Sequence, residues 1–197
     1  MKYIDFHTHH VPTATDVIAV VDGQDTWGVH PWKADETFGV PDLRDKIAIG
    51  ECGLDVACGV SIDRQLKVFT QQVELSEQVG KPLVIHCVRA IDQLLRLRRE
   101  LHPTMPWMFH GFRGKPQQLR SLLAAGFYVS FGFRYNEESL SLCPIDHLML
   151  ESDDEGRSIV DLYNNVAEQR GISKSSLCTA MAENYLAFFR KGPIKIC

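Results

Sequence analysis

Six side chains of the kinds that bind divalent metal ions stand at the ends of apolar segments along the chain. An apolar run in MKYIDFHTHH leads directly into His7 and His9. The other four end later apolar runs: Glu51 in IAIGECGLD, His86 in PLVIHC, His110 in WMFHGF and Asp153 in LMLESDD. Burying such groups without partners would cost several kcal/mol each. Together they fit two divalent ions joined by a shared carboxylate, and the imidazoles favour zinc, manganese or iron over magnesium.

These apolar segments alternate with amphipathic segments of helical period. The predicted strands are Tyr3–His7, Val17–Val21, Trp27–Val29, Ile47–Gly50, Leu83–His86, Trp107–His110, Tyr128–Ser130 and Leu148–Glu151. Helices are predicted over Asp63–Val79, before His102, before Gly126, around Leu162, and around Met181 with Ser173 as a cap. Strands that alternate with helices predict an α/β fold, and eight strands predict a TIM-barrel-like barrel. The carboxyl ends of barrel strands converge on one mouth, so the six candidate ligands would meet there.

The barrel must be a shortened one. A (β/α)₈ barrel typically has about 250 residues, with about 200 as its lower limit, and this chain has 197. Nine residues separate the first two predicted strands and five separate the next two, whereas a parallel crossover needs about a dozen. Asp-Gly in VVDGQDTW predicts a β-hairpin. We therefore expect Val17–Val21 to pair antiparallel with Trp27–Val29, in a distorted barrel that lacks its first two outer helices.

Length and composition fit one globular domain over residues 1–197, of which 45% are hydrophobic and 23% charged. No apolar run reaches the about 18 residues of a membrane span, and the first residues do not resemble a signal peptide. The six cysteines form no Cys-x-x-Cys pair. These features predict a cytoplasmic protein with reduced thiols. The bare outer face of the early strands would need the C-terminal helix or a second subunit, in a homodimer, to shield it.

The motifs HxH, GVHPW, GECGLD, PLVIHC, HGFRG and ESD, in this order, resemble the TatD family of metal-dependent hydrolases over residues 3 to about 189. The resemblance implies a TIM-barrel-like fold, one or two metal ions, and hydrolysis of phosphodiester bonds in DNA. Carried over by position, it assigns the first metal to His7, His9, Glu51 and Asp153. It assigns the second metal to His86, His110 and the bridging Glu51.

The chain departs from the family pattern on the substrate side. The usual HxRDA reads HCVRA here, which moves the arginine to Arg89, and ETDxP reads ESDDE without its proline. The segment after the first HxH is also shorter than usual. The candidate substrate contacts at the mouth are His30 in GVHPW and three arginines that follow predicted strands, Arg89, Arg113 and Arg134.

The expected reaction starts from a water shared by two cations, which lowers its pKa so that the resulting hydroxide attacks phosphorus. Asp153 is the predicted proton acceptor, with Asp154 as the alternative. The substrate would be a phosphodiester, with single-stranded DNA as one candidate. The tryptophans are predicted to be core residues; Trp32, which lies beside the mouth, is the one that would stack on a base if any does.

Three other hypotheses stay open. DFHTHH also resembles the opening of PHP-type phosphoesterases, which commonly hold three metals, but no Asp-x-His follows Glu151. A lactonase or amidase of the wider amidohydrolase group often needs a bridging modified lysine, and no lysine ends a predicted strand. The third is a degenerate barrel that binds metal or ligand without turnover, and the complete ligand set argues against it.

Overall fold

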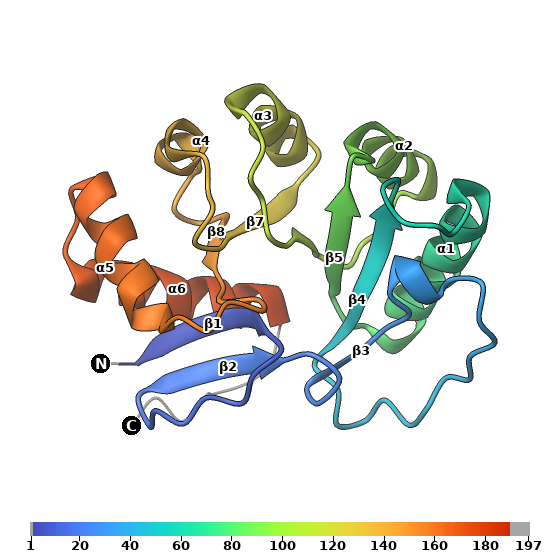
Figure 1. Ribbon diagram of the computed structural model, residues 1–197, viewed down its shortest axis with the longest axis horizontal. Helices are drawn as coiled ribbons and strands as arrows, with labels where there is room; N and C mark the ends of the chain where they lie inside the picture. Colours follow the sequence, from blue (N-terminus) through green and yellow to red (C-terminus); the bar gives the residue numbers. More distant parts are fainter. Residues whose placement is uncertain (1, 190–197) are drawn as a thin grey trace.

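The computed structural model describes residues 2–189, in which strands alternate with helices (Figure 1). The strands are β1 (Tyr3–Thr8), β2 (Val17–Val21), β3 (Thr26–Trp27), β4 (Ala48–Asp55), β5 (Leu83–Val88), β6 (Trp107–Phe109), β7 (Phe127–Phe131) and β8 (Leu148–Leu150). The helices are the 3-10 turn η1 (Pro31–Lys33), α1 (Ile62–Val79), α2 (Ile91–Leu101), α3 (Pro116–Ala124), α4 (Glu137–Leu142), α5 (Ile159–Arg170) and α6 (Lys174–Phe189). The sequence pattern predicts each α-helix except α4, whose six residues are too few to display a helical period.

The strands lie around a common centre with helices on the outside (Figure 1). Strands β3 to β8 form a six-stranded parallel sheet in sequence order, and β1 and β2 form a two-stranded parallel sheet. A parallel bridge between Thr8 and Asp153 connects β1 to the end of β8. Because β2 and β3 belong to different sheets, the barrel is not closed. The prediction of a distorted, TIM-barrel-like α/β fold is confirmed.

The predicted antiparallel hairpin is wrong. Strand β2 pairs in parallel with β1, and β3 pairs in parallel with β4. The Asp-Gly pair lies in a compact turn over residues 22–25, where Gly23 has a φ of 73°. The N–H groups of Gln24 and Asp25 both donate to the carbonyl of Val21, and the Asp25 carboxylate accepts the Val21 N–H at 2.8 Å. After this turn β3 runs in the same direction as β2. The short strands β2 and β3 can therefore satisfy their backbone groups against the longer strands β1 and β4, respectively.

The connections between the first four strands contain no α-helix. Within the described residues, the only helical segment before β4 is η1, so the prediction that the first outer helices are missing is confirmed. The last two helices cover β1 instead. Phe6 packs against Tyr185 and Phe189 of α6, with ring centroids 6.1 and 6.4 Å apart. The Tyr163 hydroxyl of α5 donates to the Ile4 carbonyl at 2.9 Å and accepts the Ile4 N–H at 3.0 Å.

As a result of this cover, β1 is buried along its whole length, whereas the first three residues of β2 are only half-buried. The C-terminal helix therefore supplies the predicted shield for β1. A second subunit over β2 stays a prediction.

The helix ends follow the predicted signals. The Ser173 hydroxyl accepts the N–H of Ser176 at 3.0 Å at the start of α6. Gly126, with a φ of 78°, follows the end of α3. Such caps satisfy terminal backbone groups and stop each helix where the chain must turn into the next strand. Successive strands consequently enter the sheet in the same direction and end at the same edge.

The core and the thiols agree with a chain without disulfides. Strand β4 is buried at every position. The described cysteines are free, namely Cys52, Cys58, Cys87, Cys143 and Cys178; Cys197 lies outside the described residues.

Trp107 is buried as predicted, but Trp32 is 60% exposed, so its prediction as a core residue is wrong. Within residues 2–189 we find no helix whose length and apolar character would let it cross a membrane.

Candidate metal centre

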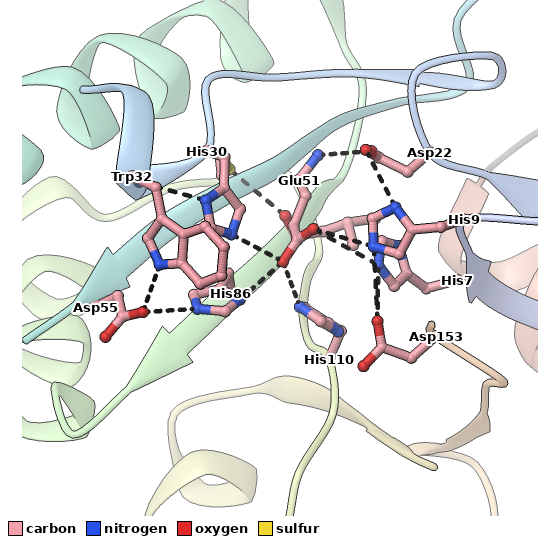
Figure 2. Close-up of polar contacts among 12 residues, drawn as sticks. His7, His9, Asp22, His30, Trp32, Glu51, Asp55, His86, His110 and Asp153 are labelled. Carbon is pink, nitrogen blue, oxygen red and sulfur yellow. Dashed lines mark hydrogen bonds and ion pairs between the residues drawn. The ribbon is translucent and has the colours of Figure 1, made fainter. Parts of the chain in front are cut away.

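The six predicted ligands lie together at the carboxyl ends of the strands, around the carboxylate of Glu51 (Figure 2). Strand β1 contributes His7, and His9 follows it directly; β4 contributes Glu51 and β5 contributes His86. His110 and Asp153 follow β6 and β8. Parallel strands bring these positions to one edge because every strand of the sheet ends there.

One oxygen of Glu51 faces the histidines of the helix-covered strands. Glu51 Oε1 lies 2.8 Å from His86 Nδ1, 2.8 Å from His110 Nε2 and 3.4 Å from His30 Nε2. Burial alone would raise the pKa of Glu51, but the contacts with His110, His30 and His86 outweigh it and hold that pKa below its usual range. Glu51 is therefore a carboxylate in spite of its burial.

The other oxygen faces the histidines of β1. Glu51 Oε2 lies 3.7 Å from the Nε2 atoms of both His7 and His9. Asp153 Oδ1 lies 3.8 Å from His7 Nε2 and 3.6 Å from His9 Nε2. These separations are too long for hydrogen bonds, yet the four side chains converge. His7, His9 and Asp153 are close enough together to hold one cation, and Glu51 borders this group through Oε2.

His7 supplies the clearest sign that a metal fits. Its side chain is fully buried, and neither ring nitrogen has a hydrogen-bond partner among the described residues. Burial, reinforced by the nearby His110, lowers the pKa of His7, which keeps the ring neutral. Neutral imidazole is the form that ligates metals, and an unpartnered buried nitrogen otherwise carries a desolvation cost.

The backbone locks Asp153 against β1. Its N–H donates to the His7 carbonyl at 3.0 Å, and its carbonyl accepts the His9 N–H at 3.1 Å. Asp153 has a φ of 54°, a left-handed conformation that aspartate tolerates better than most residues. Just before it, Ser152 donates from its N–H and its hydroxyl to the Asp5 carboxylate, at 2.9 and 2.6 Å. Burial raises the pKa of Asp5 to about 7.

Two carboxylates that the sequence interpretation missed orient two of the histidines. Asp55 Oδ2 lies 3.4 Å from His86 Nε2 and accepts the Trp32 indole N–H at 2.6 Å. Glu151 Oε1, on a fully buried side chain, lies 3.2 Å from His110 Nδ1. In each histidine the nitrogen that does not contact this carboxylate, Nδ1 of His86 and Nε2 of His110, faces Glu51. Ligand histidines commonly bond a carboxylate through their other nitrogen. The second acid of each motif, Asp55 in GECGLD and Glu151 in ESD, could therefore have indicated these partners in the sequence.

These carboxylates also set the charge of the site. Burial opposes the charge on His110, but Glu151 and Glu51 outweigh it and raise the pKa of His110 well above its ordinary value. Burial likewise opposes the charge on Asp55, but hydrogen bonds from Trp32, the Ala57 N–H and His86 leave the pKa of Asp55 lowered. The site thus combines several histidines with ionised carboxylates that contact them.

Asp22 is a further site residue that the sequence interpretation missed. Its Oδ1 accepts the Glu51 N–H at 3.0 Å and the Thr26 hydroxyl at 2.8 Å, and its Oδ2 lies 3.9 Å from His9 Nδ1. Asp22 belongs to the Asp-Gly turn that was interpreted as a hairpin. The incorrect strand direction therefore concealed a carboxylate at the mouth.

Two adjoining cavities of about 590 and 680 Å³ open over the centre. They share four lining residues, Trp32, His86, His110 and Asp153. His30 lines the cavity above Glu51, and Arg89 and Arg113 line the other. Arg134 lines neither cavity, because its guanidinium pairs with Glu155 at 2.8 Å. Three of the four predicted substrate contacts are thus brought to the cavities.

Residues 6–190 of the chain match the model of the family described as "TatD related DNase". A protein from Erwinia billingiae named "3'-5' ssDNA/RNA exonuclease TatD" is 34% identical over 146 residues, covering 65% of this chain and 56% of that protein. Its namesake from Pantoea vagans is 30% identical over 203 residues, covering 84% and 77%. The chain thus spans little more than half the length of the first relative.

Comparison with solved structures gives the same fold. YJJV, a TatD homolog from Escherichia coli, superposes with a TM-score of 0.75 and 18% identity, covering 91% of this chain and 79% of that chain. A TatD family hydrolase from Entamoeba histolytica gives a TM-score of 0.74 and 18% identity, covering 88% and 75%. At these identities the likeness is one of fold.

Proposed function

The chain belongs to the TatD-related DNase family, and we propose that it is a metal-dependent hydrolase of phosphodiester bonds in single-stranded nucleic acid. The observation that carries the proposal is the Glu51 carboxylate, whose two oxygens face two different groups of imidazoles. The names of the relatives, exonucleases of ssDNA and RNA, support the substrate class.

Two divalent ions fit the donor set. His7, His9 and Asp153 would hold one with Glu51 Oε2, and His86 and His110 would hold the other with Glu51 Oε1. The buried, unpartnered nitrogens of His7 support this division. When bound, such ions supply an activated water and offset charge on the phosphoryl oxygens. The imidazoles favour zinc, manganese or iron.

Asp153 is the proton acceptor in this proposal. Its Oδ1 lies among the ligand nitrogens, 3.6 Å from His9 Nε2, and its side chain is 25% exposed. Asp154 is 81% exposed and pairs with His10 at 3.3 Å, outside the ligand group. His30, Arg89 and Arg113 would orient the phosphate, as donors that favour its developing charge.

Hydrolysis of single-stranded oligonucleotides and small phosphodiesters tests the proposal directly. The protein is stripped with a chelator and reloaded with zinc or manganese, and the metal content is measured alongside the rate. We expect hydrolysis by the reloaded protein, none by the stripped protein, and a strongly reduced rate for Asp153→Asn.

Other outcomes would favour the alternatives. A protein that holds two ions per chain without hydrolysing any phosphodiester would favour a degenerate barrel, or a lactonase or amidase, and three ions per chain would favour a PHP-type enzyme. The homodimer, the cytoplasmic location and the single domain over 1–197 stay predictions.

A further inference from the structure

The rim of the mouth carries opposite charges on its two sides. The cavity above Glu51 is also lined by Asp22 and Asp154, which outnumber the one lysine there, Lys33. The adjoining cavity is lined instead by Arg89 and Arg113, together with apolar groups such as Phe112. A polyanionic chain that leaves the centre would be repelled on the first side and attracted on the second.

The two arginines are available for a ligand. Three other exposed arginines are ion-paired, Arg44 with Asp42, Arg96 with Glu100 and Arg134 with Glu155. The remaining exposed arginines of the described residues, Arg64, Arg99, Arg120 and Arg157, line neither cavity. Arg89 and Arg113 are exposed, and neither has a carboxylate at ion-pair distance in the part of the chain that the structure describes. An unpaired guanidinium on a cavity wall suits a phosphate, which it binds through two parallel hydrogen bonds.

Trp32 lines both cavities, and Figure 2 shows it beside His30, His86 and Asp55. It is 60% exposed, and it is the one exposed phenylalanine, tyrosine or tryptophan ring among residues 2–189. An exposed indole leaves a large apolar surface in water. Such a ring beside a site for anions is suited to stacking, because every nucleobase presents a π-face.

The Trp32 ring is also held in place before any ligand arrives. Its N–H donates to Asp55 at 2.6 Å, and its ring meets that of His30 edge-on, with centroids 4.7 Å apart and planes at 84°. Asp55 is itself fixed by the N–H of Ala57 at 2.7 Å. Stacking on a pre-ordered ring forfeits little side-chain entropy.

We infer that the cavity between Trp32 and the two arginines is a nucleotide subsite. An unpaired base stacks on Trp32, and the phosphate next along the chain is bound by Arg89 and Arg113. This inference rests on the proposed function and adds a direction to it: the strand leaves the centre toward β5 and β6, not toward Asp154. A base inside a duplex has both faces covered, so the subsite selects single strands.

Binding, rather than turnover, tests the subsite. The metal-loaded protein is titrated into fluorescein-labelled hexathymidylate with phosphorothioate linkages, which slow hydrolysis, and into the same backbone with abasic positions. Fluorescence anisotropy gives the two dissociation constants. Since base–aromatic stacking contributes about 1–3 kcal/mol per base, the chain with bases should bind about 5- to 150-fold more tightly.

The variants separate the two parts of the subsite. Trp32→Ala should abolish the preference for bases, and Trp32→Phe, which keeps a ring but loses the contact with Asp55, should retain part of it. Arg89→Gln and Arg113→Gln should weaken both probes equally. Each should reduce the slope of log K against log salt by about 0.7. Arg96→Gln, on α2 at a residue that lines neither cavity, should change neither constant.

Equal or undetectable binding of the two probes by the wild-type protein would overturn the inference, as would a Trp32→Ala variant that keeps the preference. Circular dichroism verifies that each variant is folded. A protein that shows the expected binding but leaves the unmodified oligonucleotide intact would contradict the proposed function and leave the subsite standing.

Discussion

The two halves of the barrel are built differently. From β4 to β8 each strand is followed by a helix on the outside, whereas the links from β1 to β4 are loops, a tight turn and η1 (Figure 1). Both halves nevertheless supply proposed ligands: His7 and His9 come from the bare half and the other four from the covered half. A residue at a strand end needs the pairing and burial of its strand, and for β1 the covering helices, α5 and α6, come from the far end of the chain.

Buried side chains from the covered half hold the bare half in place. Gln72 of α1 bonds both backbone groups of Val29, accepting its N–H at 2.6 Å and donating to its carbonyl at 3.1 Å. Tyr163 of α5 does the same for Ile4. These contacts satisfy backbone groups that a missing helix would otherwise shield. At the mouth, Glu51 contacts histidines of both halves, so the proposed metal centre would join them.

The largest effect is expected for Glu51→Gln, because this residue serves both halves. An amide offers a weaker ligand to both metals at once. We expect loss of both ions and a fall in hydrolysis of more than about 10⁴-fold, beyond the about 10²–10⁴-fold of a lost general base alone. Elemental analysis and rate measurement on the purified variant give both numbers. Full metal content would show that Glu51 is not shared.

Asp153→Asn should affect one side only. It removes the proton acceptor and weakens the ion beside His7 and His9, while the ion beside His86 keeps its ligands. We expect a loss of about 10²–10⁴-fold in rate with about half of the metal retained. Near-normal hydrolysis would transfer the role of proton acceptor to Asp154.

Glu151→Gln should act mainly through His110, whose Nδ1 lies 3.2 Å from the Glu151 carboxylate. The amide is nearly the same size but no longer carries the charge that orients the ring, so the ion on the covered side should weaken. Changes to such outer partners typically cost about 10–100-fold in metal affinity or activity. A chelator titration that monitors metal release from variant and wild type measures this. An unchanged metal affinity would show that Glu151 does not support the ion beside His110.

Tyr163→Phe should have the smallest effect on the reaction and act on stability. It leaves the buried N–H and carbonyl of Ile4 without their partner, at a cost of about 1–3 kcal/mol in the free energy of unfolding. Denaturant unfolding measures this, with Arg44→Gln, at an exposed ion pair, as a control expected to change little. The rate per folded molecule should stay at the wild-type value. A stability equal to that of the control would show that α5 does not hold the bare half.

The sequence was most informative where ligand-type residues recur at the ends of successive apolar runs. His7 at a strand end, or Glu51 before Cys-Gly, means little alone, but six such residues in one orientation predict a metal centre. Asp22 does not, because an aspartate before glycine is a common turn residue, and only the pairing of β2 with β1 sets the direction of the turn. Strand partners are contacts between distant segments, which local pattern does not encode.

The same limit applies to the partners of the ligands. Asp55 and Glu151 have sequence neighbours much like those of any acidic residue, and their roles appear only once His86 and His110 lie beside them. Arg134 shows the converse. Its place after β7 predicts a position at the mouth, but Glu155 arrives from the loop after β8 and pairs with it.

The shared carboxylate is the central claim, and anomalous scattering from crystals soaked in manganese or zinc tests it most directly. We predict two peaks per chain, both in contact with Glu51. One should lie against His7, His9 and Asp153, and the other against His86 and His110. A single peak, a third peak, or peaks that do not touch Glu51 would contradict the account.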